Sequence, residues 1–137
     1  MAVIDATGHV VGRLSSLVAK RLLEGEEIHI VNSEKAIITG DSDRIFREYQ
    51  RLREVGSQRK GPFYPKMPDR ILKRTVRGML PYQKPRGRAA LKRLRVYVGV
   101  PSEFEKKNLE RIEKACQITT PHYIELSELS KKLGAKL

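Results

Sequence analysis

A strand, a helix and a second strand follow one another within the first 32 residues. Residues 2–5 form a short apolar run closed by Thr7-Gly8, and residues 27–32 form a second run rich in β-branched side chains. Between them, residues 11–23 carry apolar side chains at helical spacing and end at Gly25. A strand–helix–strand unit of this length implies two parallel strands joined by a right-handed crossover. The pattern therefore predicts an α/β fold built on parallel strands.

Shorter candidate elements follow, separated by turns. A third apolar run covers residues 36–39, and helices are predicted over residues 43–55, 68–80 and 87–94. A strand is predicted over residues 96–100, and the S-x-x-E pattern at Ser102 predicts the opening of another helix. Beyond Pro121, residues 123–126 indicate a small strand and residues 127–133 a last helix. Residues 56–67 are punctuated by Gly and Pro and predict a loop that needs a partner to become ordered.

Residues 57–95 hold the whole positive excess of the chain. They contain thirteen Lys or Arg and one acid, Asp69, whereas residues 1–56 carry a net charge of −1 and residues 96–137 a net charge of +1. An ordinary solvated face interleaves acids with bases at helical spacing, and this segment does not. A block this concentrated implies a polyanionic partner, and nucleic acid is the first candidate.

The bases lie on one side of the two predicted helices. Over residues 68–80, four of them fall within an arc of roughly 100° and face away from Leu72, Val76, Met79 and Leu80. Over residues 87–94, Ala90, Leu91 and Leu94 cluster and the bases point elsewhere. The two helices and the loops beside them predict a continuous positive surface. The candidate RNA-binding residues are Arg59, Lys60, Lys66, Arg70, Lys73, Arg74, Arg77, Lys84, Arg86, Arg88, Lys92 and Arg93.

The turn with Gly8 and Gly12 offers a weaker candidate site. A phosphate-binding loop of the Walker type needs four residues between its glycines and then Lys-Ser/Thr. Here three residues separate the glycines and Arg13-Leu14 follows, while the dinucleotide fingerprint lacks its third glycine. A tight β–α turn explains the pattern, and a small nucleotide-binding α/β enzyme using this turn is the alternative. The three His residues and Cys116 have no metal-ligand spacing, so no metal or cofactor is expected.

Cysteine usage and hydropathy bear on the compartment. Cys116 is the only cysteine, which excludes an internal disulfide and suits a reducing cytosol. No apolar run approaches the ~20 residues of a membrane span, and the N-terminal residues lack the features of a signal peptide. We therefore expect a cytoplasmic protein with neither a membrane partner nor a small-molecule substrate.

Four segments carry a resemblance to a known family. They read VIDATGHVVGRLSS from Val3, IVNSEKAIITG from Ile30, RTVRGMLP from Arg74 and GRAALKRLRVYVG from Gly87. In this order they resemble the universal L-thirteen family of large-subunit ribosomal proteins. Residues 41–66 and the stretch after Pro101 are similar to the archaeal and eukaryotic branch of that family.

The resemblance implies a three-layer α/β/α single domain over residues 1–137, around a small, mainly parallel sheet. Residues 1–56 would hold the βαβ core, residues 57–95 the basic helical and loop extension, and residues 96–137 the last core strand and a C-terminal extension. It also implies a non-catalytic constituent of the large ribosomal subunit, at the cytoplasmic ribosome. Such a protein binds and organises large-subunit rRNA beside neighbouring ribosomal proteins. A regulatory RNA binder acting away from the ribosome is a second alternative, which composition does not separate.

The family's RNA-facing motifs match only some of the candidate bases. Arg59, Lys60 and Lys66 lie in a more variable loop and depend on the charge argument alone. Gly12 and Arg13 match the N-terminal motif and are interpreted as a turn with a phosphate contact. The bases that match the RNA-facing motifs are Arg74, Arg77, Lys84, Arg86, Arg88, Lys92 and Arg93.

Overall fold

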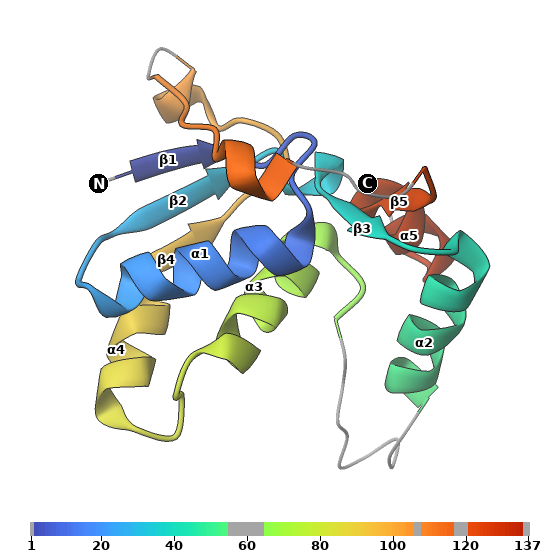
Figure 1. Ribbon diagram of the computed structural model, residues 1–137, viewed down its shortest axis with the longest axis horizontal. Coiled ribbons are helices and arrows are strands. Elements are labelled where there is room, and N and C mark those ends of the chain that lie inside the picture. The colour runs from blue at the N-terminus through green and yellow to red at the C-terminus, as the bar shows by residue number, and fades with distance from the viewer. Residues whose placement is uncertain (1, 55–64, 106–107, 117–120, 136–137) are drawn as a thin grey trace.

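The computed structural model describes residues 2–54, 65–105, 108–116 and 121–135 and contains a three-stranded parallel sheet, which lies at the left of Figure 1. Its strands, in spatial order, are β1 (Ala2–Asp5), β2 (Ile28–Val31) and β4 (Leu94–Val96). Helix α1 (Val11–Leu23) joins β1 to β2, so the predicted parallel βαβ unit is confirmed. The fold is of the predicted α/β class with a mainly parallel sheet.

Three helices cover one face of the sheet. They are α1, α3 (Pro68–Met79) and α4 (Pro85–Lys92), which lie side by side in Figure 1. Parallel strands covered by helices become nearly continuous hydrophobic runs, and all four residues of β2 are buried. The core on this face combines side chains of the strands with those of α1 and α3, namely Ile4, Ile28, Ile30, Leu94, Leu14, Val18, Leu22, Ile71, Leu72 and Val76.

The other face of the sheet is covered by the chain that follows β4. Phe104 lies in a 3-10 turn, Ser102–Phe104, and packs with Val3 and Val31 in a second buried cluster. The His29 ring is stacked against Tyr97 at 6.0 Å and tilted against Phe104 at 5.1 Å between ring centroids. In the described residues, this second layer consists of a 3-10 turn and extended chain.

A two-stranded antiparallel sheet lies beside the main one. It pairs β3 (Ile37–Thr39) with β5 (Tyr123–Glu125), and α5 (Leu126–Lys132) follows directly. An isolated bridge between Val10 and Ile37 connects β3 to the start of α1. Helix α2 (Ser42–Glu54) continues from β3 and lies near α5 at the right of Figure 1.

The last parallel strand starts earlier than predicted. The sequence predicted a strand over residues 96–100, whereas β4 runs over Leu94–Val96 because Leu94 pairs with Ile28 at the buried edge of β2. Gly99, with φ of 73°, then turns the chain away from the sheet. The preceding helix accordingly ends at Lys92, two residues before its predicted end, and begins at Pro85.

Three other local predictions were wrong in detail. The helix expected from Ser102 is a single 3-10 turn, because the chain must next run beside β1, where Glu110 hydrogen-bonds to Val3 and Asp5. Helix α3 ends at Met79, one residue early. Met79 was placed on the apolar face and is instead 43% exposed, whereas Ile71 is fully buried.

Candidate nucleic-acid interface

Helix α3 combines a buried side and a basic side. Pro68 occupies its first turn, where a missing N–H costs nothing, and Asp69 suits the positive end of the helix dipole. Ile71, Leu72 and Val76 are buried against the core. Of the predicted bases, Arg70 and Lys73 are exposed, and Arg74 and Arg77 are half-buried. The buried side of α3 therefore fixes the helix to the core while its bases face outward.

A tight corner connects α3 to α4. The N–H of Lys84 donates to the carbonyl of Pro81 over 2.9 Å, and the N–H of Gly87 donates to the carbonyl of Lys84 over 3.1 Å. A β-carbon on Gly87 would lie 2.0 Å from the Pro81 carbonyl oxygen, so only glycine allows this approach. The corner thereby fixes the direction of α4 relative to α3.

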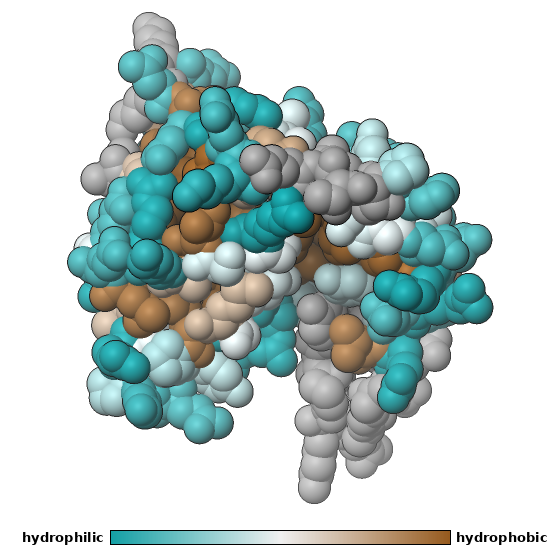
Figure 2. Space-filling view, viewed as in Figure 1, coloured by the Kyte–Doolittle hydropathy of each residue, from teal (hydrophilic) through white to brown (hydrophobic). Residues whose placement is uncertain are grey.

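Helix α4 presents bases on its outer side. Gly87 and Ala90 are its buried residues. Lys84, Arg86, Arg88 and Lys92 are all exposed. In the space-filling view, hydrophilic side chains gather over the region that Figure 1 assigns to α4 and to the chain between α3 and α4 (Figure 2). We call the predicted bases of α3, the corner and α4 the basic surface; it comprises Arg70, Lys73, Arg74, Arg77, Lys84, Arg86, Arg88, Lys92 and Arg93.

Within the described ranges, acids of the protein do not neutralise the basic surface. Among the described residues, no carboxylate lies within 4.0 Å of any of its bases. Arg21, outside this surface, shows the contrast: its guanidinium is 2.6 Å from a Glu26 oxygen and 2.9 Å from a Glu110 oxygen. These two acids, Glu26 first, raise the pKa of Arg21, and Arg21 in turn lowers that of Glu26. The described bases of this surface therefore carry charge that no carboxylate of the described chain pairs with.

Three bases of this surface also make contacts within the protein. Arg93 donates to the carbonyl of Leu22 over 2.6 Å and so satisfies the C-terminal end of α1. The Arg77 guanidinium lies 4.5 Å from the centre of the Tyr82 ring, a cation–π distance. Arg88 donates to the Gln83 carbonyl over 3.4 Å. For Arg93, a structural role therefore accompanies the predicted one.

The remaining predicted bases are distributed unevenly. Lys66 is exposed just before α3. Arg59 and Lys60 lie outside the described residues. Arg95 also lies in the basic segment but is not among the predicted RNA-binding residues. It is exposed next to buried Leu94 and lines a hollow with Arg70 and Lys73, and the alternation of side chains along β4 is the signal that could have found it.

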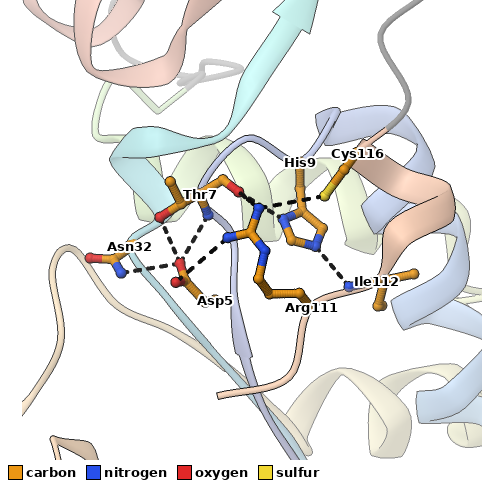
Figure 3. Close-up of polar contacts among 7 residues, drawn as sticks. All are labelled: Asp5, Thr7, His9, Asn32, Arg111, Ile112 and Cys116. Atoms are coloured by element: carbon orange, nitrogen blue, oxygen red, sulfur yellow. Dashed lines mark hydrogen bonds and ion pairs between the residues drawn. The ribbon is translucent and has the colours of Figure 1, made fainter.

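Side chains of the protein itself pack against the turn between β1 and α1 (Figure 3). Gly8 adopts φ of 74°, and Arg111 lies across the turn, where it donates to the Thr7 carbonyl over 2.9 Å. Asp5 accepts hydrogen bonds from the hydroxyl of Thr7 over 2.7 Å and from the side-chain amide of Asn32 over 3.1 Å. Burial opposes ionisation of Asp5, but these bonds and the nearby Arg111 outweigh it and hold the pKa of Asp5 below its ordinary value.

His9 of the same turn is fully buried and engaged at both ring nitrogens. Its Nε2 accepts from the N–H of Ile112 over 3.0 Å, so its Nδ1 carries the proton and donates to the Thr7 carbonyl over 3.2 Å. Burial lowers the pKa of His9 and favours this neutral form. The polar side chains of Asp5 and His9 and the carbonyl of Thr7 are therefore engaged within the protein, which makes this part of the turn a structural junction and argues against the nucleotide-binding alternative.

No group of three or more His, Cys, Asp or Glu within the described ranges could hold a metal ion. Nor is any helix in those ranges long and apolar enough to cross a membrane.

Comparisons with known proteins show the family to which the chain is similar. The family model described as "Ribosomal protein L13" matches residues 1–103. The Large ribosomal subunit protein uL13 of Archaeoglobus fulgidus is 53% identical over 135 residues, covering 96% of this chain and 86% of the relative. The proteins of the same name from Methanosarcina barkeri and Methanocaldococcus jannaschii are each 54% identical, and each alignment covers 99% of both chains.

Proposed function

The chain belongs to the ribosomal protein L13 family, and we propose that it is a structural constituent of the large ribosomal subunit that binds and organises large-subunit rRNA through the basic surface. Proteins of this family are structural and non-enzymatic. The archaeal relatives also agree with the resemblance of residues 41–66 and of the C-terminal third to the archaeal branch.

The observation that carries the proposal is the anchored, unopposed charge of the basic surface. Like charges held close together repel one another and destabilise the compact state. A phosphate backbone neutralises them and releases its counterions, which makes binding favourable and sensitive to salt. Because A-form RNA hides its base edges in a deep, narrow groove, most contacts of this surface go to phosphates and 2′-hydroxyls.

The shared core supports one RNA-binding domain over residues 1–137. Helices α1 and α3 contact each other, and both belong to the core that contains the strands before and after the basic surface. The helices that carry the basic surface therefore pack against this core with their other sides. We infer that the protein's neighbours on the ribosome include RNA segments and other large-subunit proteins.

Charge reversal tests the proposal. Arg77→Glu with Arg88→Glu removes two bases of the surface, and Arg86→Glu with Lys92→Glu removes two that make no side-chain hydrogen bond or ion pair with the described residues. Lys20→Glu with Lys131→Glu is the matched control, because both lysines are exposed on α1 and α5 and the charge change is equal. Filter binding to deproteinised large-subunit rRNA should be lost in the first two variants and retained in the control. Equal affinity in all three would refute the proposal.

Sedimentation separates the ribosomal role from a regulatory one. A structural constituent stays with the large subunits through a high-salt wash and is released only when the particle is disassembled. A regulatory RNA binder would leave the large subunits at the wash.

A further inference from the structure

Two large apolar side chains are exposed inside the basic surface. Met79 is 43% exposed and Tyr82 is 37% exposed, and both lie where α3 ends and the chain turns toward α4. This corner is at the lower left of Figure 1. Isolated apolar side chains are common on protein surfaces, but the helical period placed Met79 on the buried side of α3, and departures from such rules are expected at functional sites. The corner is therefore a candidate contact for a partner.

The ring of Tyr82 is held in place by a base of the same surface. The guanidinium carbon of Arg77 lies 4.5 Å from the centre of the ring, over one of its faces. A cation at this distance is attracted by the π electrons of the ring. Although Arg77 covers one face, Tyr82 still presents more than a third of its surface to solvent. A ring that is both fixed and accessible loses little entropy when a ligand binds to it.

The charges around the corner restrict the kind of partner. Lys84, Arg86 and Arg88 follow Tyr82 closely and are exposed, and no carboxylate of the described residues lies within 4.0 Å of them. A partner that covers the ring must therefore bring negative charge beside a flat apolar surface. A nucleotide does so in one unit, because its base has a π face and its phosphates carry the charge. An apolar protein segment would bring no charge for these bases.

An unpaired base suits the ring better than a duplex does. A base inside a duplex has neighbours on both faces, whereas the splayed-out bases of loops, bulges and ends can stack on aromatic side chains. We infer that Tyr82 stacks on one unpaired base of the RNA, and that the phosphates flanking that base lie on Lys84 and Arg86. This inference rests on the proposed function and deepens it, since it identifies a single-stranded nucleotide among the RNA elements bound. Every base has a π face, so the contact tolerates any base and strengthens binding by about 5- to 150-fold.

Nuclear magnetic resonance titration of the full chain, with ¹³C-labelled tyrosine, tests the inference. One probe is a ribose–phosphate oligomer of about five units with a single adenine at its centre, and the other is the same oligomer without any base. The adenine probe should bind about 5- to 150-fold more tightly and should shift the ring signals of Tyr82 further than the base-free probe does. Equal affinity for the two probes overturns the inference. Ring signals of Tyr82 that adenine leaves unchanged also overturn it, and they favour a protein segment as the partner of the ring.

Three variants assign the effect to this ring. Tyr82→Leu keeps an apolar side chain but removes the π face, and it should bring the affinities for the two probes to within about twofold of each other. Tyr82→Phe should keep the preference for adenine. Tyr123→Leu is the matched control and should also keep it, because Tyr123 is 50% exposed on β5, outside the basic surface. A preference that survives in Tyr82→Leu, or that is lost in Tyr123→Leu, overturns the inference.

The base-free probe separates this inference from the proposed function, because it measures the phosphate contacts alone. Arg86→Glu with Lys92→Glu should weaken both probes alike, whereas Tyr82→Leu should leave the affinity for the base-free probe unchanged. Thermal unfolding of each variant confirms that the fold is intact. Weaker binding of the base-free probe to a folded Tyr82→Leu protein would show that the ring arranges the bases and does not stack, which overturns the inference and leaves the proposed function standing.

Discussion

The Cα atom of Gly87 lies so close to the carbonyl group of Pro81 that a methyl group has no room on it. A β-carbon at this position would be 2.0 Å from the carbonyl oxygen and 2.8 Å from the N–H nitrogen of Tyr82. Both opposing atoms are backbone, so no side-chain rotation relieves the clash. The first turn of α4 rests directly on the corner that ends α3, and this contact sets the spacing between the two rows of bases.

Gly87→Ala should therefore separate α4 from the corner. We expect a loss of about 1–3 kcal/mol in the free energy of unfolding, the usual cost of overpacking, and weaker binding to rRNA. Urea unfolding measures the first effect and filter binding the second. Gly78→Ala is the control, because residue 78 lies in the same basic segment, inside α3, with no atom near its absent β-carbon. That variant should gain about 0.5–1 kcal/mol from helix propensity. A stable, tightly binding Gly87→Ala protein would contradict the spacing argument.

Arg93 should separate folding from binding. Its guanidinium closes the C-terminal end of α1 through the Leu22 carbonyl, and the bond is both short and partly buried. Arg93→Ala should therefore lower the free energy of unfolding by about 1–2 kcal/mol, the range for a hydrogen bond to a charged group after partial exposure. Lys92→Ala, one residue earlier and exposed, should leave stability within about 0.5 kcal/mol. Thermal or urea unfolding of the pair measures the difference, and equal stabilities would exclude the capping role.

Salt should weaken RNA binding steeply. If the basic surface contacts about 6–10 phosphates, affinity should fall about 10³–10⁵-fold between roughly 50 and 200 mM monovalent salt. Filter binding over that range gives the slope of log affinity against log salt. Each base whose removal eliminates one phosphate contact should reduce the magnitude of that slope by about 0.7–0.9. A flat dependence would mean that the charges of α3 and α4 face no phosphate.

Acid should destabilise the junction around His9. Burial holds the pKa of His9 below its ordinary value of about 6.5, so the unfolded chain binds a proton that the native chain does not as the pH falls through that value. The free energy of unfolding should therefore decrease as the pH drops below about 6.5. The lowered pKa of Asp5 adds a second loss at more acidic pH, below its ordinary value of about 3.9.

Urea unfolding between pH 5 and 7.5 measures the contribution of His9. His9→Asn should unfold more easily throughout, yet its stability should change less with pH, because the titrating group is gone. The comparison uses the slope of the unfolding free energy against pH in each protein, and not the absolute stabilities. A variant with the slope of the wild type would show that another group titrates.

Local patterns predicted the elements that periodicity determines. The bounds of α1 were predicted to the residue, because a strong helical spacing ends at Gly25, and β2 was predicted within one residue at each end. The two basic helices were also found, since their apolar sides and the proline at the start of α3 are visible in the sequence, but α4 begins two residues before its predicted start. The RNA-contacting role of the bases on them stays a prediction.

Tertiary contacts determined the rest. The start of β4 depends on pairing between Leu94 and Ile28. The position of the Arg93 guanidinium depends on its hydrogen bond to the Leu22 carbonyl, which is 71 residues away in the sequence. Asp69 appears in the sequence only as the single acid of the basic segment, and the tertiary structure alone shows that one of its oxygens is enclosed. Residues far apart in the chain create these features, so no local pattern contains them.

The order of the strands has a consequence for how the chain matures during its own synthesis. Ribosomes deliver a polypeptide from its N-terminus, so β1, α1 and β2 emerge first, and the basic helices emerge before β4 can dock beside Ile28. Before β4 pairs with β2, α3 and α4 lack the sheet edge against which they pack, and such long-range pairing forms late. The nascent protein therefore passes through an interval in which its cations are present but not yet arranged, and RNA that meets it then encounters charge without a defined shape.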